Sequence, residues 1–152
     1  MVGAVVVSPS GVIVGQGAHL QAGGPHAEVA ALDAAHGHTR GSTLYVTLEP
    51  CCHRGRTGPC VAGMVSDAVA RVVLPVRDPN PLVSGGGATY LRLHGVAITE
   101  GVLAAAATEL NAPFFTWIAE RRPFVTVKAA ASADGFVGRP GLRVHLTGEE
   151  SE

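Results

Sequence analysis

The sequence feature that most constrains the fold is a group of three potential metal ligands that lie far apart along the chain. His26 stands in the segment His26-Ala27-Glu28, and Cys51 and Cys60 each follow a proline. One histidine and two cysteines supply three ligands of a tetrahedral zinc site, and a fourth position left open is typical of a catalytic site rather than a structural one. A fold that uses all three must bring their segments to one point.

Glu28 is placed to serve the same site if a helix begins at His26. Residues i and i+2 lie about 200° apart on a regular helix, so His26 and Glu28 can face one cavity only at the first turn. The preceding Gly-Gly-Pro, residues 23–25, is consistent with a helix start here. Zinc lowers the pKa of a bound water toward neutrality, and a carboxylate that is not a ligand can carry its protons. Glu28 is therefore the candidate catalytic residue.

Taken one at a time, these residues have simpler explanations. His26 could be a histidine at a helix start, and Cys51 and Cys60 could be small core residues. However, the three cysteines of the chain lie within ten residues, and an odd number favours a metal site over a disulfide framework. Cys52 is interpreted as a bystander, because adjacent thiolates rarely bind one ion with good geometry.

Composition excludes several classes of partner. The 152 residues carry 11 Lys+Arg against 12 Asp+Glu, and aromatic residues make up 5%. A net charge near zero disfavours a nucleic-acid-binding surface or a polybasic membrane anchor, and few aromatic residues disfavour a base-stacking platform. The apolar run at residues 2–7 is too short to span a membrane and lacks the basic flank of a signal peptide. A cytoplasmic location is expected, with neither nucleic acid nor a membrane as partner.

The pattern of apolar runs and turn residues predicts an α/β fold. Short β-branched runs alternate with alanine-rich helical segments, and this order favours right-handed crossovers and a mixed sheet with helices on its faces. A helix over 102–121 is expected to kink or split at Pro113. The predicted strands are residues 2–7, 12–17, 43–48, 71–76, 96–99 and 124–130. The other predicted helices are residues 26–36, 61–70 and 88–94.

The combined motif matches the zinc deaminase signature, His-x-Glu followed by Pro-Cys-x-x-Cys, except that eight residues separate Cys51 from Cys60. This insertion resembles the RibD family of bifunctional riboflavin biosynthesis proteins, in their pyrimidine deaminase domain. The resemblance covers nearly the whole chain. Its motifs are Val2-Gly-Ala-Val-Val6, Gly23-Gly-Pro-His-Ala-Glu28, Tyr45-Val-Thr-Leu-Glu-Pro-Cys51, His53-Arg-Gly-Arg-Thr-Gly-Pro-Cys60, Asp78-Pro-Asn-Pro81 and Lys128-Ala-Ala-Ala-Ser-Ala-Asp-Gly135.

The resemblance implies a three-layer cytidine deaminase-like fold with a mixed five-stranded sheet and helices on both faces. It also implies hydrolytic removal of a ring amine, as ammonia, from a diaminopyrimidinone bearing a ribosylamino 5'-phosphate. Zn²⁺ is the expected cofactor, and no organic cofactor is expected; self-association into a homo-oligomer stays open. The implied residues are His26, Cys51 and Cys60 as zinc ligands, Glu28 as proton shuttle, and His19, His53, Arg56, Asp78 and Asn80 as substrate contacts.

The two ends of the chain depart from the family pattern. Members of the family begin with a helix and a Pro-Asn-Pro segment ahead of the first strand, whereas this chain starts at Met1-Val2, so we expect apolar surface on one face of the sheet. We expect a deaminase domain over 1–121 and the truncated start of a reductase-like domain over 122–152, without reductase activity. Two alternatives are a nucleoside or tRNA deaminase and a catalytically impaired zinc-binding remnant.

Overall fold

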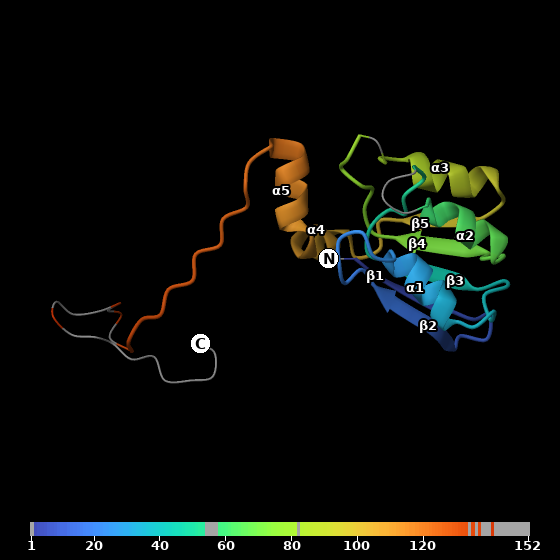
Figure 1. The fold of residues 1–152 in the computed structure, drawn as a ribbon, viewed down its shortest axis with the longest axis horizontal. Helices are drawn as coiled ribbons and strands as arrows, with labels where there is room; N and C mark the ends of the chain where they lie inside the picture. Colours follow the sequence, from blue (N-terminus) through green and yellow to red (C-terminus); the bar gives the residue numbers. More distant parts are fainter. Residues whose placement is uncertain are drawn as a thin grey trace.

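The computed structural model describes residues 2–53, 58–81, 83–133, 135, 137 and 141, which are built around one mixed sheet (Figure 1). The sheet has five strands in the order β2-β1-β3-β4-β5. The strands are β1 (Gly3–Val7), β2 (Ile13–Ala18), β3 (Thr43–Val46), β4 (Arg71–Leu74) and β5 (Ala97–Glu100). The helices are α1 (Ala27–Ala34), α2 (Cys60–Ser66), α3 (Gly86–Leu93), α4 (Ala104–Leu110) and α5 (Ala112–Glu120).

The sheet is antiparallel on one side and parallel on the other. β1 pairs antiparallel with both β2 and β3, whereas β3, β4 and β5 run parallel, connected through α2 and α3. Parallel strands end at the same edge of a sheet, which is where α/β folds bind ligands. The segments that follow β3 and β4 carry Cys51 and Asp78, so the topology brings these two residues to one edge.

The hydrophobic core lies between the sheet and the layer formed by α1, α2 and α3 (Figure 1). Alternate residues of the strands point into it, as the period of two in a strand requires. Its largest fully buried apolar side chains are Leu44, Met64, Leu74, Leu91, Val6, Val61 and Val72. These residues fix the three helices against one face.

Small residues allow α1 to lie unusually close to β2. A Cβ atom added at Gly15 would overlap the carbonyl oxygen of Ala31, and one added at Gly17 would lie 2.6 Å from the carbonyl oxygen of Ala27. Ala27 and Ala31 are fully buried in this contact. Because the helix backbone rests on the strand, the start of α1 is fixed relative to the sheet, and with it the position of His26.

The second face of the sheet is less covered. It borders an apolar cavity of about 690 Å³, lined by Val5, Tyr45 and Val73 from the strands and by Leu103 and Leu110 at the two ends of α4. The expected apolar surface on one face of the sheet is therefore present. Among the described residues, no helix is long and apolar enough to cross a membrane.

In the C-terminal part, the expected break in the helix over 102–121 is present, whereas the expected strand over 124–130 is not found among the described residues. The helix expected over 102–121 is divided at Asn111 into α4 and α5, one residue before α5 begins and two before Pro113. The predicted strand at 124–130 is wrong: these residues are exposed and form no strand in the described structure. Their alternating pattern has no neighbouring strand with which to pair, and Figure 1 shows this segment leading away from the sheet.

Candidate metal centre

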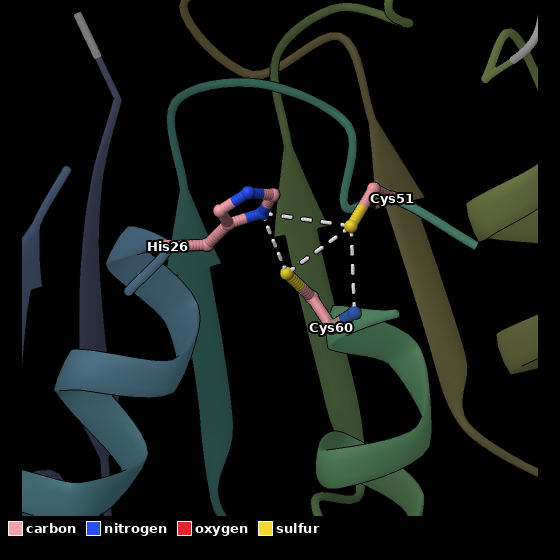
Figure 2. A group of neighbouring side chains, drawn as sticks. All are labelled: His26, Cys51 and Cys60. Carbon is pink, nitrogen blue, oxygen red and sulfur yellow. Dashed lines mark hydrogen bonds between the residues drawn. The ribbon is translucent and has the colours of Figure 1, made fainter. Parts of the chain in front are cut away.

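Three side chains from separate segments meet at the carboxyl edge of the sheet. His26 Nδ1 lies 3.0 Å from Cys60 Sγ and 3.5 Å from Cys51 Sγ, and the two sulfur atoms are 3.3 Å apart. Figure 2 shows the imidazole pointing from the start of α1 toward both sulfur atoms, with Cys60 at the start of α2 and Cys51 in the segment after β3. The structure thus brings the predicted ligands together.

The local chain geometry explains why each ligand faces the others. His26 is the residue immediately before α1 and has extended backbone angles, φ −70° and ψ 156°. Pro59 holds the same position before α2, so Cys60 is the first helical residue. The backbone N–H of Cys60 donates to Cys51 Sγ at 3.4 Å. An N–H at a helix start has no partner within the helix, and its bond to Cys51 Sγ favours negative charge on the sulfur.

The pKa values of the two cysteines shift in opposite directions. The hydrogen bond between the Cys51 and Cys60 side chains, together with the Cys60 N–H and His26, lowers the pKa of Cys51 to about 5. The pKa of Cys60 is raised, first by its hydrogen bond to Cys51 and then by burial. This shift favours the thiolate form of Cys51. The thiolate is the form of cysteine that binds metal ions.

The donor set fits zinc. Within the described structure, His26, Cys51 and Cys60 form a group whose ligand atoms all lie within 4.8 Å of one another. A tetrahedral zinc with typical bond lengths would hold such donors roughly 3.5–3.8 Å apart. The observed separations of 3.0–3.5 Å are close to this, so a small opening of the triangle accommodates the ion.

Glu28 lies beside the three donor atoms and not among them. It is the second residue of α1, is 3% exposed and hydrogen-bonds Cys60. Burial is the main reason that the pKa of its carboxyl is raised above the ordinary value. Since His26 precedes the helix and Glu28 is in its first turn, both face the same cavity, as their spacing predicts.

That cavity measures about 110 Å³ and gathers part of the predicted substrate set. His19 and Asp78 line it together with His26, Glu28 and Cys51. The His19 ring packs edge-on against the His26 ring, with centroids 5.3 Å apart, and its Nδ1 bonds the carbonyl oxygen of Pro25 at 2.9 Å. The remaining lining residues are Val2, Ala27, Leu48 and Glu49.

The other three substrate candidates lie next to this cavity or outside the described residues. Burial raises the pKa of Asp78, and the nearby His53 partly offsets this increase. The buried Nδ1 of His53 has no hydrogen-bond partner among the described residues. Asn80 donates its backbone N–H to Asp78 Oδ1 at 2.8 Å. Arg56 lies in the segment 54–57, outside the described residues.

Two features of the site were not predicted from the sequence. Glu49 lines the cavity with its side chain 4% exposed, and three backbone N–H groups of the 78–88 segment donate to it. Gly86 and Gly87 allow the start of α3 to lie directly against the metal-binding segment, by which we mean the residues around Cys51. A Cβ atom at Gly87 would overlap the carbonyl oxygen of Pro50. The sequence signal that could have indicated the first feature is the position of Glu49, directly after the strand predicted over 43–48 and directly before Pro50-Cys51.

Comparison with known proteins now decides the family. Residues 1–75 match the model of the cytidine and deoxycytidylate deaminase zinc-binding region. The chain is also 52% identical over 151 residues to riboflavin biosynthesis protein RibD from Aquifex aeolicus, an alignment that covers 99% of this chain and 42% of the relative. This chain belongs to the zinc-binding cytidine and deoxycytidylate deaminase family. For this deaminase-family chain, zinc is confirmed as the cofactor.

Solved structures agree with this assignment. The deaminase-family chain superimposes on Acinetobacter baumannii RibD with a TM-score of 0.81 and 43% identity, covering 88% of this chain and 37% of that one. It superimposes on a Thermotoga maritima diaminohydroxyphosphoribosylaminopyrimidine deaminase/reductase with a TM-score of 0.80 and 44% identity, covering 88% and 38%. The predicted fold class is confirmed. The chain spans about two fifths of the length of the curated relatives it matches.

Proposed function

We propose that this chain is a zinc-dependent pyrimidine deaminase of riboflavin biosynthesis. The substrate would be the diaminopyrimidinone that carries a ribosylamino 5'-phosphate, and the products would be the corresponding uracil and ammonia. The observation that carries the proposal is the convergence of His26, Cys51 and Cys60 beside the buried Glu28 in one cavity. The names of the relatives, which include a diaminohydroxyphosphoribosylaminopyrimidine deaminase, support the choice of substrate.

In this proposal, His26, Cys51 and Cys60 hold the metal and Glu28 moves the protons. Zinc, when bound, lowers the pKa of its water molecule, so that this water can attack at neutral pH. Glu28 is buried and has a raised pKa, which suits a group that must both accept and return a proton. Its carboxylate would accept one proton from the attacking water and pass it to the ring nitrogen, and would then carry the proton of the new hydroxyl group to the leaving amine. A C–O bond forms, the C–N bond breaks and ammonia leaves.

The substrate side of the cavity is assigned to residues from three segments. Asp78 and His19 line the cavity and offer polar groups to the pyrimidine ring, and Asn80 is connected to Asp78 by a hydrogen bond. His53 has a buried ring nitrogen without a partner among the described residues, so a polar group of the substrate could satisfy it. Arg56 is proposed as a phosphate contact on chemical grounds, because a guanidinium suits an oxyanion.

The proposed boundary of the deaminase domain is residue 121, where α5 has ended. We interpret 122–152 as the start of a second, reductase-like domain. The proposed partner is a small phosphorylated pyrimidine, and the proposed location is the cytoplasm. The free thiols at the site support that location, because a reducing compartment preserves them.

A substrate panel tests the proposal. The zinc-loaded chain is incubated with the pyrimidine phosphate, with free nucleosides and with tRNA, and ammonia release is measured. We expect release from the pyrimidine phosphate alone. Release from nucleosides or tRNA but not from the pyrimidine phosphate would support the alternative deaminase instead. Zinc bound with no ammonia from any of the three would show a non-catalytic zinc-binding unit.

A further inference from the structure

We propose that Glu49 is a positioning residue that holds the Asp78 loop at a fixed distance from the metal-binding segment. The inference rests on the proposed function for its meaning, since Asp78 is there assigned to the substrate. Glu49 is not one of the three proposed metal ligands, and the proposed function gives it no part in proton transfer. The argument depends on where the hydrogen bonds of its carboxylate go.

All three hydrogen bonds described for this carboxylate come from backbone amides of one stretch of chain. Oε2 accepts from the N–H of Asp78 at 3.2 Å and from the N–H of Gly85 at 2.9 Å. Oε1 accepts from the N–H of Ala88 at 3.1 Å. Glu49 is 4% exposed, so water cannot easily replace these bonds. One side chain from the segment after β3 is therefore hydrogen-bonded both to the loop after β4 and to the start of α3.

The carboxylate supplies α3 with the cap that its own sequence lacks. The residue before the helix is Gly85, in the left-handed conformation with φ 75°, and a glycine has no side chain to accept the first N–H groups of the helix. Ala88 is the third residue of α3, the position whose N–H is usually capped. Glu49 accepts that N–H from outside the helix. A negative charge at a helix start is also favoured by the helix dipole.

The same carboxylate connects the two halves of the proposed site. Glu49 precedes the ligand Cys51 by two residues, and through Oε2 it holds the backbone of Asp78, whose side chain is 8% exposed and lines the cavity. Asp78 in turn accepts the N–H of Asn80. A shift of the loop would therefore move Asp78 relative to the metal ligands while leaving the ligands in place. This predicts an effect on substrate affinity rather than on metal binding.

Glu49→Gln tests the role with little change in shape. Glutamine keeps one carbonyl oxygen and replaces the other with an NH₂ group, which cannot accept, so at least one of the three N–H groups loses its partner. We expect KM for the pyrimidine phosphate to rise about tenfold to a hundredfold, the range that corresponds to one lost bond to a charged group, while kcat changes much less. Zinc content is expected to equal that of the wild type. Glu49→Asp keeps the charge on a shorter side chain and should give an intermediate KM.

Thr39→Val is the matched control for a general loss of stability. Thr39 is 5% exposed and donates from Oγ1 to the carbonyl oxygen of Asp67 at 2.8 Å, at the opposite edge of the sheet. Its replacement removes a buried hydrogen bond but none near the cavity. We expect Thr39→Val to lower Tm without changing KM.

Amide hydrogen exchange gives a readout that does not depend on turnover. In the zinc-loaded Glu49→Gln variant, at least one of the amides of Asp78, Gly85 and Ala88 should exchange at least about tenfold faster than in the wild type, whereas Thr39→Val should not single them out. Unchanged KM and unchanged exchange at these amides would overturn the proposal. If the wild type releases no ammonia, the proposed function fails, and the exchange comparison still decides the role of Glu49. If Glu49→Gln does not fold, Glu49→Asp is judged by the same measurements.

Discussion

Glu28→Gln is expected to lower kcat by about 10²–10⁴-fold while zinc content and Tm stay close to those of the wild type. The glutamine side chain has nearly the same shape but can neither accept the proton of the attacking water nor return it to the leaving amine. Because Glu28 is not one of the three donor residues, its replacement leaves the metal ligands intact. The measurement is single-turnover ammonia release from the pyrimidine phosphate, with zinc determined on the same sample.

Asp33→Asn is the matched control for this change. Asp33 lies on the same helix, α1, and is exposed, so the substitution removes a carboxylate of similar chemistry away from the cavity. Its turnover is expected to equal that of the wild type. If Glu28→Gln retains full turnover with full zinc, the assignment of Glu28 as the proton shuttle is wrong.

Gly87→Ala is expected to lower the free energy of unfolding by about 3 kcal/mol and to weaken substrate binding. Inside a helix, alanine is intrinsically favoured over glycine by about 0.5–1 kcal/mol. Here the added Cβ would overlap the carbonyl oxygen of Pro50, and neither backbone can turn aside as a flexible side chain could. The steric term is therefore larger than the gain in propensity. Denaturant unfolding and KM for the pyrimidine phosphate measure the two effects.

Gly63→Ala separates the steric term from the intrinsic preference. Gly63 is a half-buried residue in α2, and a Cβ atom added there would meet nothing within 4 Å. Only the preference of the helix for alanine then acts, so the free energy of unfolding of this variant should rise by about 0.5–1 kcal/mol. If both variants are stabilised to the same degree, the close approach of α3 to Pro50 is not present in solution.

The metal centre was predictable because few local arrangements satisfy its spacing. His26 and Glu28 could face one cavity only at the first turn of a helix, which was expected to begin at His26, and the structure starts α1 one residue later, at Ala27. Cys51 was expected after a strand and lies there, and Cys60, expected just before a helix, is the first residue of α2. The parallel arrangement of β3 and β4 then brought Asp78 to the same edge, as the rule for ligand sites in such sheets predicts.

The features that escaped prediction depend on contacts between segments rather than on local pattern. Glu49 accepts backbone N–H groups of the 78–88 segment, so its role depends on the path of that segment. The segment contains turn residues and no hydrophobic periodicity from which its path could be predicted. The need for glycine at 87 arises only from the approach of α3 to Pro50. The alternating residues at 124–130 favoured a strand, but a strand needs a neighbour, and none is present in the described structure.

The most direct test of the account is the coordination of zinc in the metal-loaded wild-type chain, measured by X-ray absorption. With His26, Cys51 and Cys60 as ligands, the spectrum should show two sulfur atoms at about 2.3 Å and nitrogen or oxygen atoms at about 2.0 Å, with one zinc per chain. Cys52 lies outside this group of donors and should contribute no third sulfur. Three sulfur ligands, or a chain that binds no zinc, would contradict the proposed centre and the chemistry built on it.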